Sequence, residues 1–304
     1  MSDRRDRPGT KGTAGATRTA PAGDLLSVSD LRVSFATDQG LARVLDGVSL
    51  TIGHGEVMGL VGESGCGKTT LARAILGVLP ANSARIESGS IVFGGKPLLE
   101  LPPEEVAAAI RGRRITFIPQ DPYASFNPLF RVRSQIDEIM KWKSPRQSAQ
   151  PRSGLSALLA GYPRERRAAD RASAIALLRK VQIPQPEAAL SKLPHEFSGG
   201  QRQRLMIAMS LLPDPDLIIA DEPTTALDVT IQAQILQLLR VLVKERGISV
   251  LFTTHDLGTA HEICDRVTVM YAGQEMETAP TRSFFARPAH PYTCLLYTSP
   301  SPRD

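Results

Sequence analysis

Long apolar runs are missing from this chain of 304 residues. No stretch approaches the roughly 18–20 consecutive apolar residues that a membrane-spanning helix needs, so we expect any membrane role to come through a partner. Hydrophobic residues make up 42% of the chain and charged residues 22%, which is ordinary for a soluble globular protein. The length is sufficient for one large α/β domain, alone or with a small appendage.

A strong charge of one sign is also missing. The net charge is +5, and residues 1–23 hold five Lys and Arg against two Asp, a balance of +3, which leaves 5 − 3 = +2 for the remainder. Because this excess is small, we predict no nucleic-acid partner. Residues 1–23 are basic and contain almost no apolar side chains that could pack, so we expect a disordered tail. No apolar segment follows Arg4-Arg5, which excludes a twin-arginine export signal.

Cysteine is scarce, and the three cysteines show no spacing typical of a disulfide framework or a metal site. This pattern favours a reduced cytosolic setting. Residues 294–304, which include Cys294, resemble the translation of a transposase sequencing adapter. We therefore expect this segment to be an assembly artefact that replaces the native carboxyl terminus, and we exclude it from fold reasoning. A genuine Pro/Ser-rich tail is the alternative.

Apolar periodicity predicts a mixed α/β sheet with an antiparallel edge at the front, in a domain that spans residues 24–293. Residues 25–35 and 44–52 alternate apolar and polar side chains like antiparallel strands, with turn residues at 38–40 between them. A helix is expected over residues 69–79, ending before Pro80. Further strands are predicted at 56–61, 90–93, 115–118, 216–221, 249–253 and 266–271.

The middle of the chain has a different pattern. Helical stretches dominate from residue 130 onward, which predicts an inserted helical subdomain over about residues 130–211. Within it, residues 144–167 are rich in Pro, Ser, Gln and Arg. We interpret this segment as an exposed, mobile insertion, and a solvated loop is favoured over a partner-binding segment.

A phosphate-binding pattern, G-x-x-x-x-G-K-[ST], occurs once, between a predicted strand and a predicted helix. Its glycines allow backbone N–H groups to curl around a phosphate, and the helix amino terminus adds positive potential. Lys68 would contact the β- and γ-phosphates, and the Thr69 hydroxyl would ligate Mg²⁺. An accidental Gly-rich turn is the alternative, which the strand-loop-helix context disfavours. The predicted nucleotide-binding residues of this segment are Gly62, Glu63, Ser64, Gly65, Cys66, Gly67, Lys68, Thr69 and Thr70.

A second pattern is an apolar run, residues 217–220, that ends in Asp221 and Glu222. A buried parallel strand delivers its carboxyl end to the ligand crevice of an α/β sheet. Asp221 is therefore predicted to face Mg²⁺, and Glu222 to polarise the attacking water. Such a pair is usually structural in isolation, but together with the Lys68 loop the functional interpretation is favoured.

A third pattern, Ser198-Gly199-Gly200-Gln201, precedes an amphipathic stretch at residues 202–212. Ser198 is predicted to be a helix N-cap, and the glycines would leave the first N–H groups open as a second anion site. A plain capped helix is the alternative.

The order of these motifs resembles that of ABC ATPases, P-loop NTPases in which the signature motif of one subunit closes over the nucleotide held by another. Gln120 matches the Q-loop, residues 226–228 the D-loop, His255 the switch histidine and Phe35 the aromatic that stacks on adenine. Phe35 as a core residue is the alternative. The resemblance spans about residues 25–293 and implies ATP hydrolysis with Mg²⁺. It implies catalytic roles for Glu222, His255 and Gln120, metal contacts for Thr69, Gln120 and Asp221, and contacts in trans for Ser198, Gly199, Gly200, Gln201 and Asp228.

A narrower resemblance is carried by residues 120–128 and by His290-Pro291-Tyr292-Thr293, which are similar to importers of oligopeptides, dipeptides and nickel. Residues 84–89 look like the D-type ATPase of those systems. The resemblance implies a second ATPase subunit, F-type-like or a copy of this chain, two transmembrane permease subunits and, indirectly, an extracytoplasmic solute-binding protein. It places the chain peripherally at the cytoplasmic side of the membrane. The alternatives are an exporter ATPase and a non-transport ABC protein acting on DNA or ribosomes.

Overall fold

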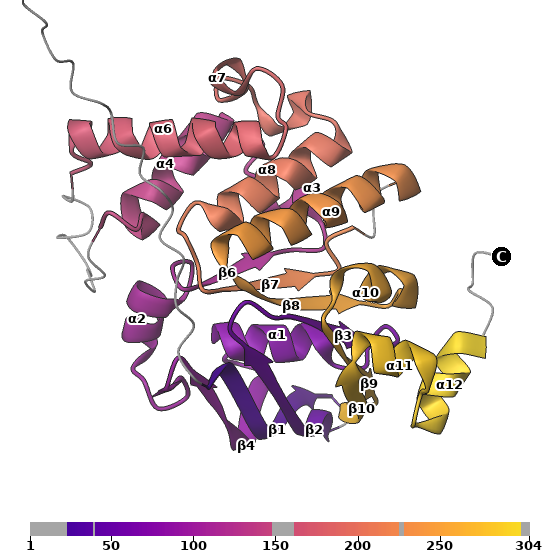
Figure 1. Cartoon of the computed structure of the whole chain (residues 1–304). Coiled ribbons are helices and arrows are strands. Elements are labelled where there is room, and N and C mark those ends of the chain that lie inside the picture. The colour runs from indigo at the N-terminus through magenta and orange to yellow at the C-terminus, as the bar shows by residue number, and fades with distance from the viewer. Residues whose placement is uncertain (1–22, 39, 148–160, 225–227, 299–304) are drawn as a thin grey trace, which may run out of the picture.

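The computed structural model describes residues 23–38, 40–147, 161–224 and 228–298, and Figure 1 shows its ribbon. Four features predicted from the sequence lie wholly or partly outside these residues. They are the basic tail up to residue 22, most of the insertion at 144–167, the D-loop positions 226 and 227, and the last six residues of the adapter-like segment.

The amino-terminal strands form an antiparallel sheet of four strands in the order β2-β1-β4-β5. The hairpin between β1 and β2 closes where Thr37 pairs with Gly40, and Gly40 takes the left-handed φ of 117°. β1 pairs with β2 on one edge and with β4 on the other. The predicted antiparallel strands thus form a sheet of their own rather than an edge of the parallel sheet. The strands are β1 (Asp24–Thr37), β2 (Gly40–Gly53), β4 (Ala84–Phe93) and β5 (Lys96–Pro97).

The second sheet has six strands in the order β10-β9-β3-β8-β7-β6. The pairs from β9 to β6 are parallel, and β10 runs antiparallel at one edge. Every residue of β3, β7 and β8 is buried, as expected for parallel strands covered on both faces. The prediction of a mixed α/β fold is confirmed. The strands are β3 (Val57–Val61), β6 (Ile115–Ile118), β7 (Leu217–Asp221), β8 (Ser249–Thr254), β9 (Arg266–Tyr271) and β10 (Gln274–Pro280).

The six-stranded sheet separates two hydrophobic cores, because successive side chains of a strand point to opposite faces. On β3, Val57 and Val61 join the core on the side of α8 and α9. Met58 and Leu60 join the core shared with α1 and the antiparallel sheet. Figure 1 shows α1 below β6, β7 and β8, and α8 and α9 above them. These helices are α1 (Lys68–Leu76), α8 (Gly199–Leu211) and α9 (Val229–Arg246).

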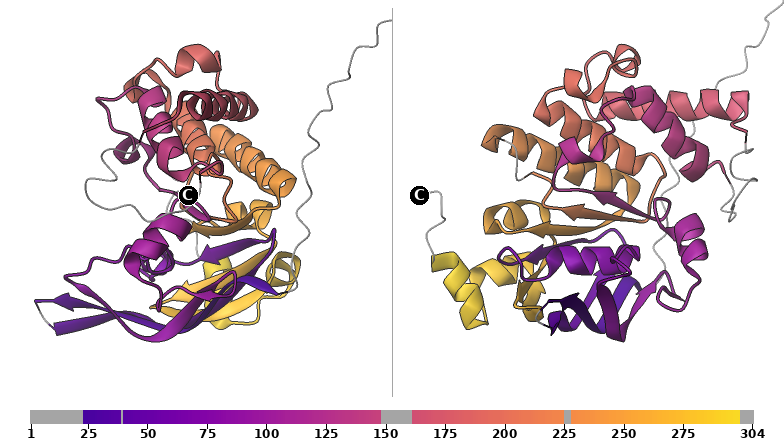
Figure 2. Two further views of the ribbon diagram at one scale, coloured as in Figure 1. Left: turned by 90° about the vertical axis from the view of Figure 1, so that its left-hand side faces the viewer. Right: turned by 180° about the vertical axis from the view of Figure 1, so that it is seen from behind.

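The described residues between β6 and β7 contain helices and no strand, and they gather at one end of the molecule in both views of Figure 2. They comprise α3 (Pro122–Ser125), α4 (Val132–Lys143), α6 (Arg164–Lys180), α7 (Pro186–Ala189), the 3-10 turn Pro194–Glu196 and α8. The remaining helices are α2 (Pro103–Glu105) with the π-turn Val106–Ile110, α10 (Leu257–Ile263), α11 (Thr281–Ala286) and α12 (Pro291–Thr298). No helix in the described part of the chain is long and apolar enough to cross a membrane.

Local differences from the sequence predictions have local causes. The first helix ends at Leu76 rather than before Pro80, because Gly77 adopts a left-handed conformation and its N–H returns to the Ala74 carbonyl, a glycine stop signal. β4 begins at Ala84, six residues before the predicted start, and β10 was not predicted. Both additional segments are largely exposed, so neither has the buried apolar face by which the other strands were recognised.

Candidate functional site

Four neighbouring strands bring the predicted catalytic residues to one edge of the sheet. The strands β3, β8, β7 and β6 lie side by side and run parallel. Their carboxyl ends lead into the phosphate-binding loop after β3, His255 after β8, Glu222 after β7 and Gln120 shortly after β6. Ligands of open α/β sheets bind at this edge.

The phosphate-binding loop has no room for side chains at two of its glycines. A Cβ on Gly62 would lie 2.3 Å from the Met270 carbonyl oxygen, and a Cβ on Gly67 would lie 2.8 Å from the Leu45 side chain. Gly67 is the N-cap of α1, has φ 110° and supplies no side-chain cap. The first turn of α1 therefore presents backbone N–H groups that no capping side chain occupies, which suits an anionic ligand.

Lys68 is held beneath this loop and is 5% exposed. Its Nζ donates to the carbonyl oxygens of Gly62 at 2.7 Å and Glu63 at 2.9 Å, and lies 3.8 Å from Glu222 Oε1. Cys66 Sγ is 3.8 Å from the same ammonium. Burial raises the pKa of the Cys66 thiol despite the adjacent Lys68 charge, so the thiol stays protonated near neutrality.

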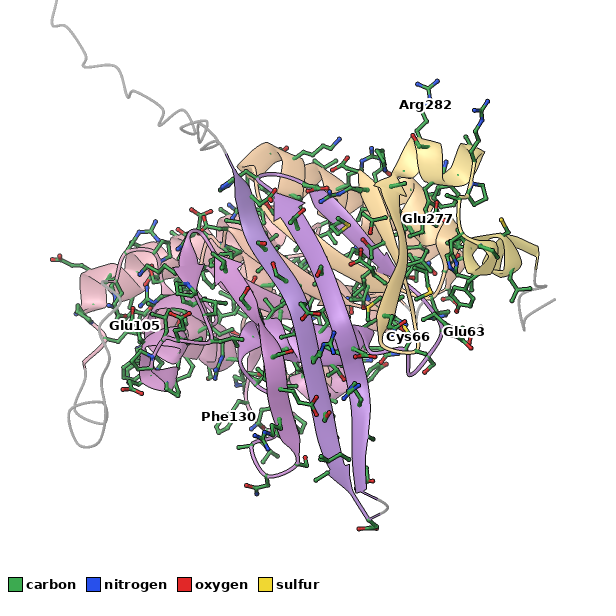
Figure 3. All side chains as sticks on the ribbon, turned by 90° about the horizontal axis from the view of Figure 1, so that it is seen from below. Glu63, Cys66, Glu105, Phe130, Glu277 and Arg282 are labelled. Carbon is green, nitrogen blue, oxygen red and sulfur yellow. The ribbon has the colours of Figure 1, made fainter. Side chains whose placement is uncertain are left out.

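Figure 3 shows Glu63 and Cys66 of the loop beside the carboxyl-terminal ribbon that carries Glu277. At this side of the loop, the Tyr292 ring of α12 lies on the Tyr271 ring at the end of β9, with centroids 4.5 Å apart. Gly273, two residues further on, donates its N–H to the Cys66 carbonyl at 3.0 Å. The carboxyl-terminal segment is thus packed on the strand end that supports the loop.

The Glu222 carboxylate is the meeting point of the predicted catalytic side chains. Gln120 Nε2 donates to Glu222 Oε2 at 3.0 Å, and His255 Nδ1 lies 3.2 Å from the same oxygen. The other oxygen, Oε1, faces Lys68. We refer to Lys68, Gln120, Glu222 and His255 as the Glu222 cluster. Its members come from four separate segments of the chain, and the structure brings all of them together.

Asp221 and Thr69, both predicted to contact Mg²⁺, are also adjacent. Thr69 Oγ1 donates to Asp221 Oδ2 at 3.0 Å, and Asp221 is 5% exposed. A further residue holds this carboxylate from the opposite side, since Thr253 Oγ1 donates to Asp221 Oδ1 at 2.6 Å. Sequence reasoning did not single out Thr253. The available signal was a hydroxyl directly after the apolar residues Val250, Leu251 and Phe252 of a buried strand, two residues before His255.

The Ser198–Gln201 segment begins α8, on the opposite face of the sheet from α1. Ser198 is the N-cap, as predicted, and forms a reciprocal capping box with Gln201. Gly200 is buried against α9, where a Cβ would lie 2.9 Å from Ile231 Cγ2. Asp228 is the exposed N-cap residue of α9, so the segments predicted to act in trans belong to two helices that pack together.

Phe35 is not part of the Glu222 cluster. It lies near the end of β1 in the antiparallel sheet, opposite Ala42 and Ala84, and its half-buried side chain packs against the core that contains α1. The remaining residues of the loop, Glu63, Ser64 and Gly65, are exposed.

A buried lysine on a glycine loop, a hydroxyl at the start of the following helix and two carboxylates after a neighbouring parallel strand define a P-loop nucleoside-triphosphatase. Comparison with known proteins narrows this class. The family model described as ABC transporter matches residues 45–225. The chain is similar to a probable peptide ABC transporter ATP-binding protein of Sinorhizobium fredii, y4tR, at 46% identity over 90% of this chain and 76% of that protein. It is also similar to the oligopeptide transport ATP-binding protein OppD of Salmonella typhimurium, at 43% identity over 91% of this chain and 76% of that protein.

Solved structures agree on the fold. A dimeric post-hydrolysis state of an ATP-binding cassette bound to ADP and Pi superimposes with a TM-score of 0.68 and 26% identity, over 84% of this chain and 99% of that one. The cbiO1 protein of Clostridium perfringens, part of an ABC transporter complex, gives a TM-score of 0.67 and 26% identity, over 87% of this chain and 91% of that one. The chain belongs to the ABC transporter family, in the branch of peptide-transport ATP-binding proteins, and is an ABC ATPase.

Proposed function

We propose that this chain is the ATP-hydrolysing subunit of an importer for peptides or related small solutes. The observation that carries the proposal is the Glu222 cluster. A general base must lie within hydrogen-bond reach of the water it activates, and a phosphoryl-transfer site works mainly by positioning and charge stabilisation. In this role Glu222 would polarise the attacking water, and Gln120 and His255 would hold its carboxylate in register.

The phosphates of ATP would occupy the loop from Gly62 to Thr70. Lys68 already places its ammonium at the loop, where it is bound by carbonyl oxygens and faces Glu222. A phosphate would offer this cation a stronger, charged acceptor than a neutral carbonyl. Phe35 is the proposed stacking partner for adenine, at the end of β1.

The residues at Asp221 fit a magnesium ion. Mg²⁺ prefers oxygen ligands and is usually bound by one or two carboxylates together with substrate phosphates, and the Thr69 hydroxyl and Asp221 carboxylate supply such oxygens 3.0 Å apart. Among the described residues, no group of three or more His, Cys, Asp or Glu side chains forms an all-protein metal site. Thr69, Asp221 and Gln120 would hold the ion, which would neutralise charge on the phosphates when bound.

Hydrolysis would take place in a dimer of ATPase subunits. The Ser198–Gln201 segment and the Gly62–Thr69 loop of one chain begin helices on opposite faces of the six-stranded sheet, which supports a role for the former at a nucleotide held by another subunit. Asp228 would join it across the interface. The solved cassette with ADP and Pi is dimeric, which supports this arrangement. The second subunit would be an F-type-like ATPase or a copy of this chain.

The proposed partners follow from the relatives with peptide-transport names. We place the chain at the cytoplasmic side of the membrane, bound to two transmembrane permease subunits, with a solute-binding protein acting on the outer side. Copurification of tagged chain with permeases would support transport, whereas salt-sensitive binding to nucleic acid would favour a non-transport role.

The test of the catalytic assignment is Glu222→Gln in the assembled complex. The change keeps the size of the side chain and removes the base, so ATP turnover should fall by about 10²- to 10⁴-fold while ATP binding is retained. Glu262→Gln, at an exposed position of α10, is the matched control and should behave like the wild type. Unchanged turnover in Glu222→Gln would remove Glu222 from the mechanism.

A further inference from the structure

The buried hydroxyl of Thr253 has no role in the mechanism proposed so far. Thr253 is 0% exposed and lies directly across from Asp221 in the parallel register of β7 and β8. The preceding residues of the strand, Val250, Leu251 and Phe252, are buried and apolar. An apolar β-branched residue would fill such a position without desolvating a polar group, so the hydroxyl must be explained by what it contacts.

Thr253 Oγ1 uses both halves of its hydrogen-bonding capacity on the two acidic residues of the site. It donates to Asp221 Oδ1 at 2.6 Å and accepts the backbone N–H of Glu222 at 3.2 Å. A hydroxyl has one hydrogen to donate and lone pairs to accept with, so the two bonds are compatible. One side chain thus touches both carboxylate-bearing residues.

The first bond fixes the rotation of the Asp221 carboxylate. With Oδ1 held by Thr253, Oδ2 is the oxygen nearer to Thr69, at 3.0 Å against 3.3 Å for Oδ1. A carboxylate anchored in this way presents a defined oxygen towards the Thr69 hydroxyl. Hydrogen-bonded partners of metal-binding carboxylates orient them and tune the affinity of the site.

The second bond anchors Glu222 at a strained position. Glu222 has a φ of 46°, in the left-handed region that a residue with a Cβ rarely adopts. Its N–H is held by both the Thr253 carbonyl oxygen at 3.1 Å and the Thr253 hydroxyl. The backbone turn that aims the Glu222 side chain at Gln120 and His255 is therefore attached to Thr253.

We propose that Thr253 is a positioning residue that sets the orientation of Asp221 towards the magnesium–nucleotide complex and holds the turn that aims Glu222. The inference rests on the proposed function, because it assumes that Thr69 and Asp221 bind Mg²⁺ together with ATP. Thr253 itself does not touch the reacting atoms.

The test compares Thr253→Val, which is isosteric but has no hydroxyl, with Thr253→Ser, which restores it. Both are made in the full chain carrying Glu222→Gln, so that nucleotide is not consumed. The probe is a fluorescent ATP analogue, titrated without Mg²⁺ and then at increasing Mg²⁺. Thr268→Val is the matched control, since Thr268 is an equally buried threonine of the same sheet whose hydroxyl contacts Thr278 and Met58 instead.

We expect Thr253→Val to bind the ATP analogue without Mg²⁺ as tightly as the parent chain does. It should need about 10- to 100-fold more Mg²⁺ to reach half of the maximal Mg²⁺-induced increase in analogue binding. Thr253→Ser and Thr268→Val should show the same Mg²⁺ dependence of analogue binding as the parent chain. If Thr253→Val does not fold, Thr253→Ala serves the same comparison. If Thr253→Val binds the analogue with the same Mg²⁺ dependence as the parent chain, the inference about Thr253 is wrong and the proposed metal site stands. If nucleotide binding by the parent chain itself does not depend on Mg²⁺, the proposed metal site is wrong as well.

Discussion

Gly62 offers the sharpest test of the loop geometry. In Gly62→Ala, the new Cβ would lie 2.3 Å from the Met270 carbonyl oxygen and 2.7 Å from Cys66 Sγ. Real Cβ contacts do not fall below 3.0 Å, so either the loop or β9 must move by at least 0.7 Å. β9 cannot easily yield, because it pairs with β3 up to Val61, the residue before Gly62.

The displacement therefore falls on the loop, and with it on the Gly62 carbonyl that binds Lys68. Overpacking of this kind costs about 1–3 kcal/mol of folding free energy, and a misplacement of about 1 Å in a binding site costs about 10²-fold in function. We expect Gly62→Ala to unfold at a lower temperature and to bind the fluorescent ATP analogue about 10- to 100-fold more weakly.

Gly95→Ala is the control for backbone strain without a clash. Gly95 has a φ of 77° in the turn between β4 and β5, and a Cβ there meets nothing within 4 Å. It should lose about 1–2 kcal/mol of stability and no nucleotide affinity. If Gly62→Ala binds the ATP analogue with wild-type affinity, the phosphate-binding loop can relax around the added methyl group. The inference that Gly62 is required by the close approach of the Met270 carbonyl would then be wrong.

Three further predictions follow from other parts of the molecule. Asp170 is 1% exposed and binds Ser144, Arg146 and Tyr162, so Asp170→Ala should lower the free energy of unfolding in denaturant by about 3 kcal/mol, with Asp170→Asn losing less. Burial raises the thiol pKa of Cys66 and Cys264 above the ordinary 9.0. The folded state therefore keeps protons that the unfolded state releases, and stability measured by thermal unfolding should decline as pH rises above about 9. A rise in stability above pH 9 would contradict the raised pKa of these two buried thiols. Ser198→Arg should leave ATP binding by its own chain unchanged but reduce turnover of the assembled dimer, and loss of binding in the isolated chain would argue against a role in trans.

Much of this architecture could be predicted because the relevant signals are local. The phosphate-binding loop is a contiguous pattern, and its context of buried strand and helix is visible in the sequence. Residues 217–221 are apolar up to the first carboxylate and become β7, a strand with every residue buried. Ser198 is followed three residues later by Gln201, a spacing that specifies a capping box, and the box is present.

The features of the fold and the site that could not be predicted depend on pairing between segments distant in the sequence. The sequence predicts β1 and β2 as the antiparallel edge of a mixed sheet, whereas β1 pairs with β2 and β4 in a separate sheet. Thr253 illustrates the same limit within the site. Its residue type is compatible with any buried strand, and its significance appears only when β8 lies beside β7 in the register that sets it opposite Asp221.

The strand order also explains why β8 and the residue just beyond it contact both Asp221 and Glu222. Along the chain the site segments follow in the order β3, β6, β7 and β8, but in the sheet β8 lies between β3 and β7. The strand that carries the phosphate-binding loop therefore never pairs with the strand that carries Asp221 and Glu222. Thr253 contacts the carboxylates from within β8, and His255 contacts Glu222 from just beyond its end. A small shift of β8 would thus change the Asp221 and Glu222 carboxylates together through the Thr253 hydroxyl and the His255 ring, whereas the segment after β6 contacts Glu222 through one side chain, that of Gln120, beside the backbone pairing of β6 with β7.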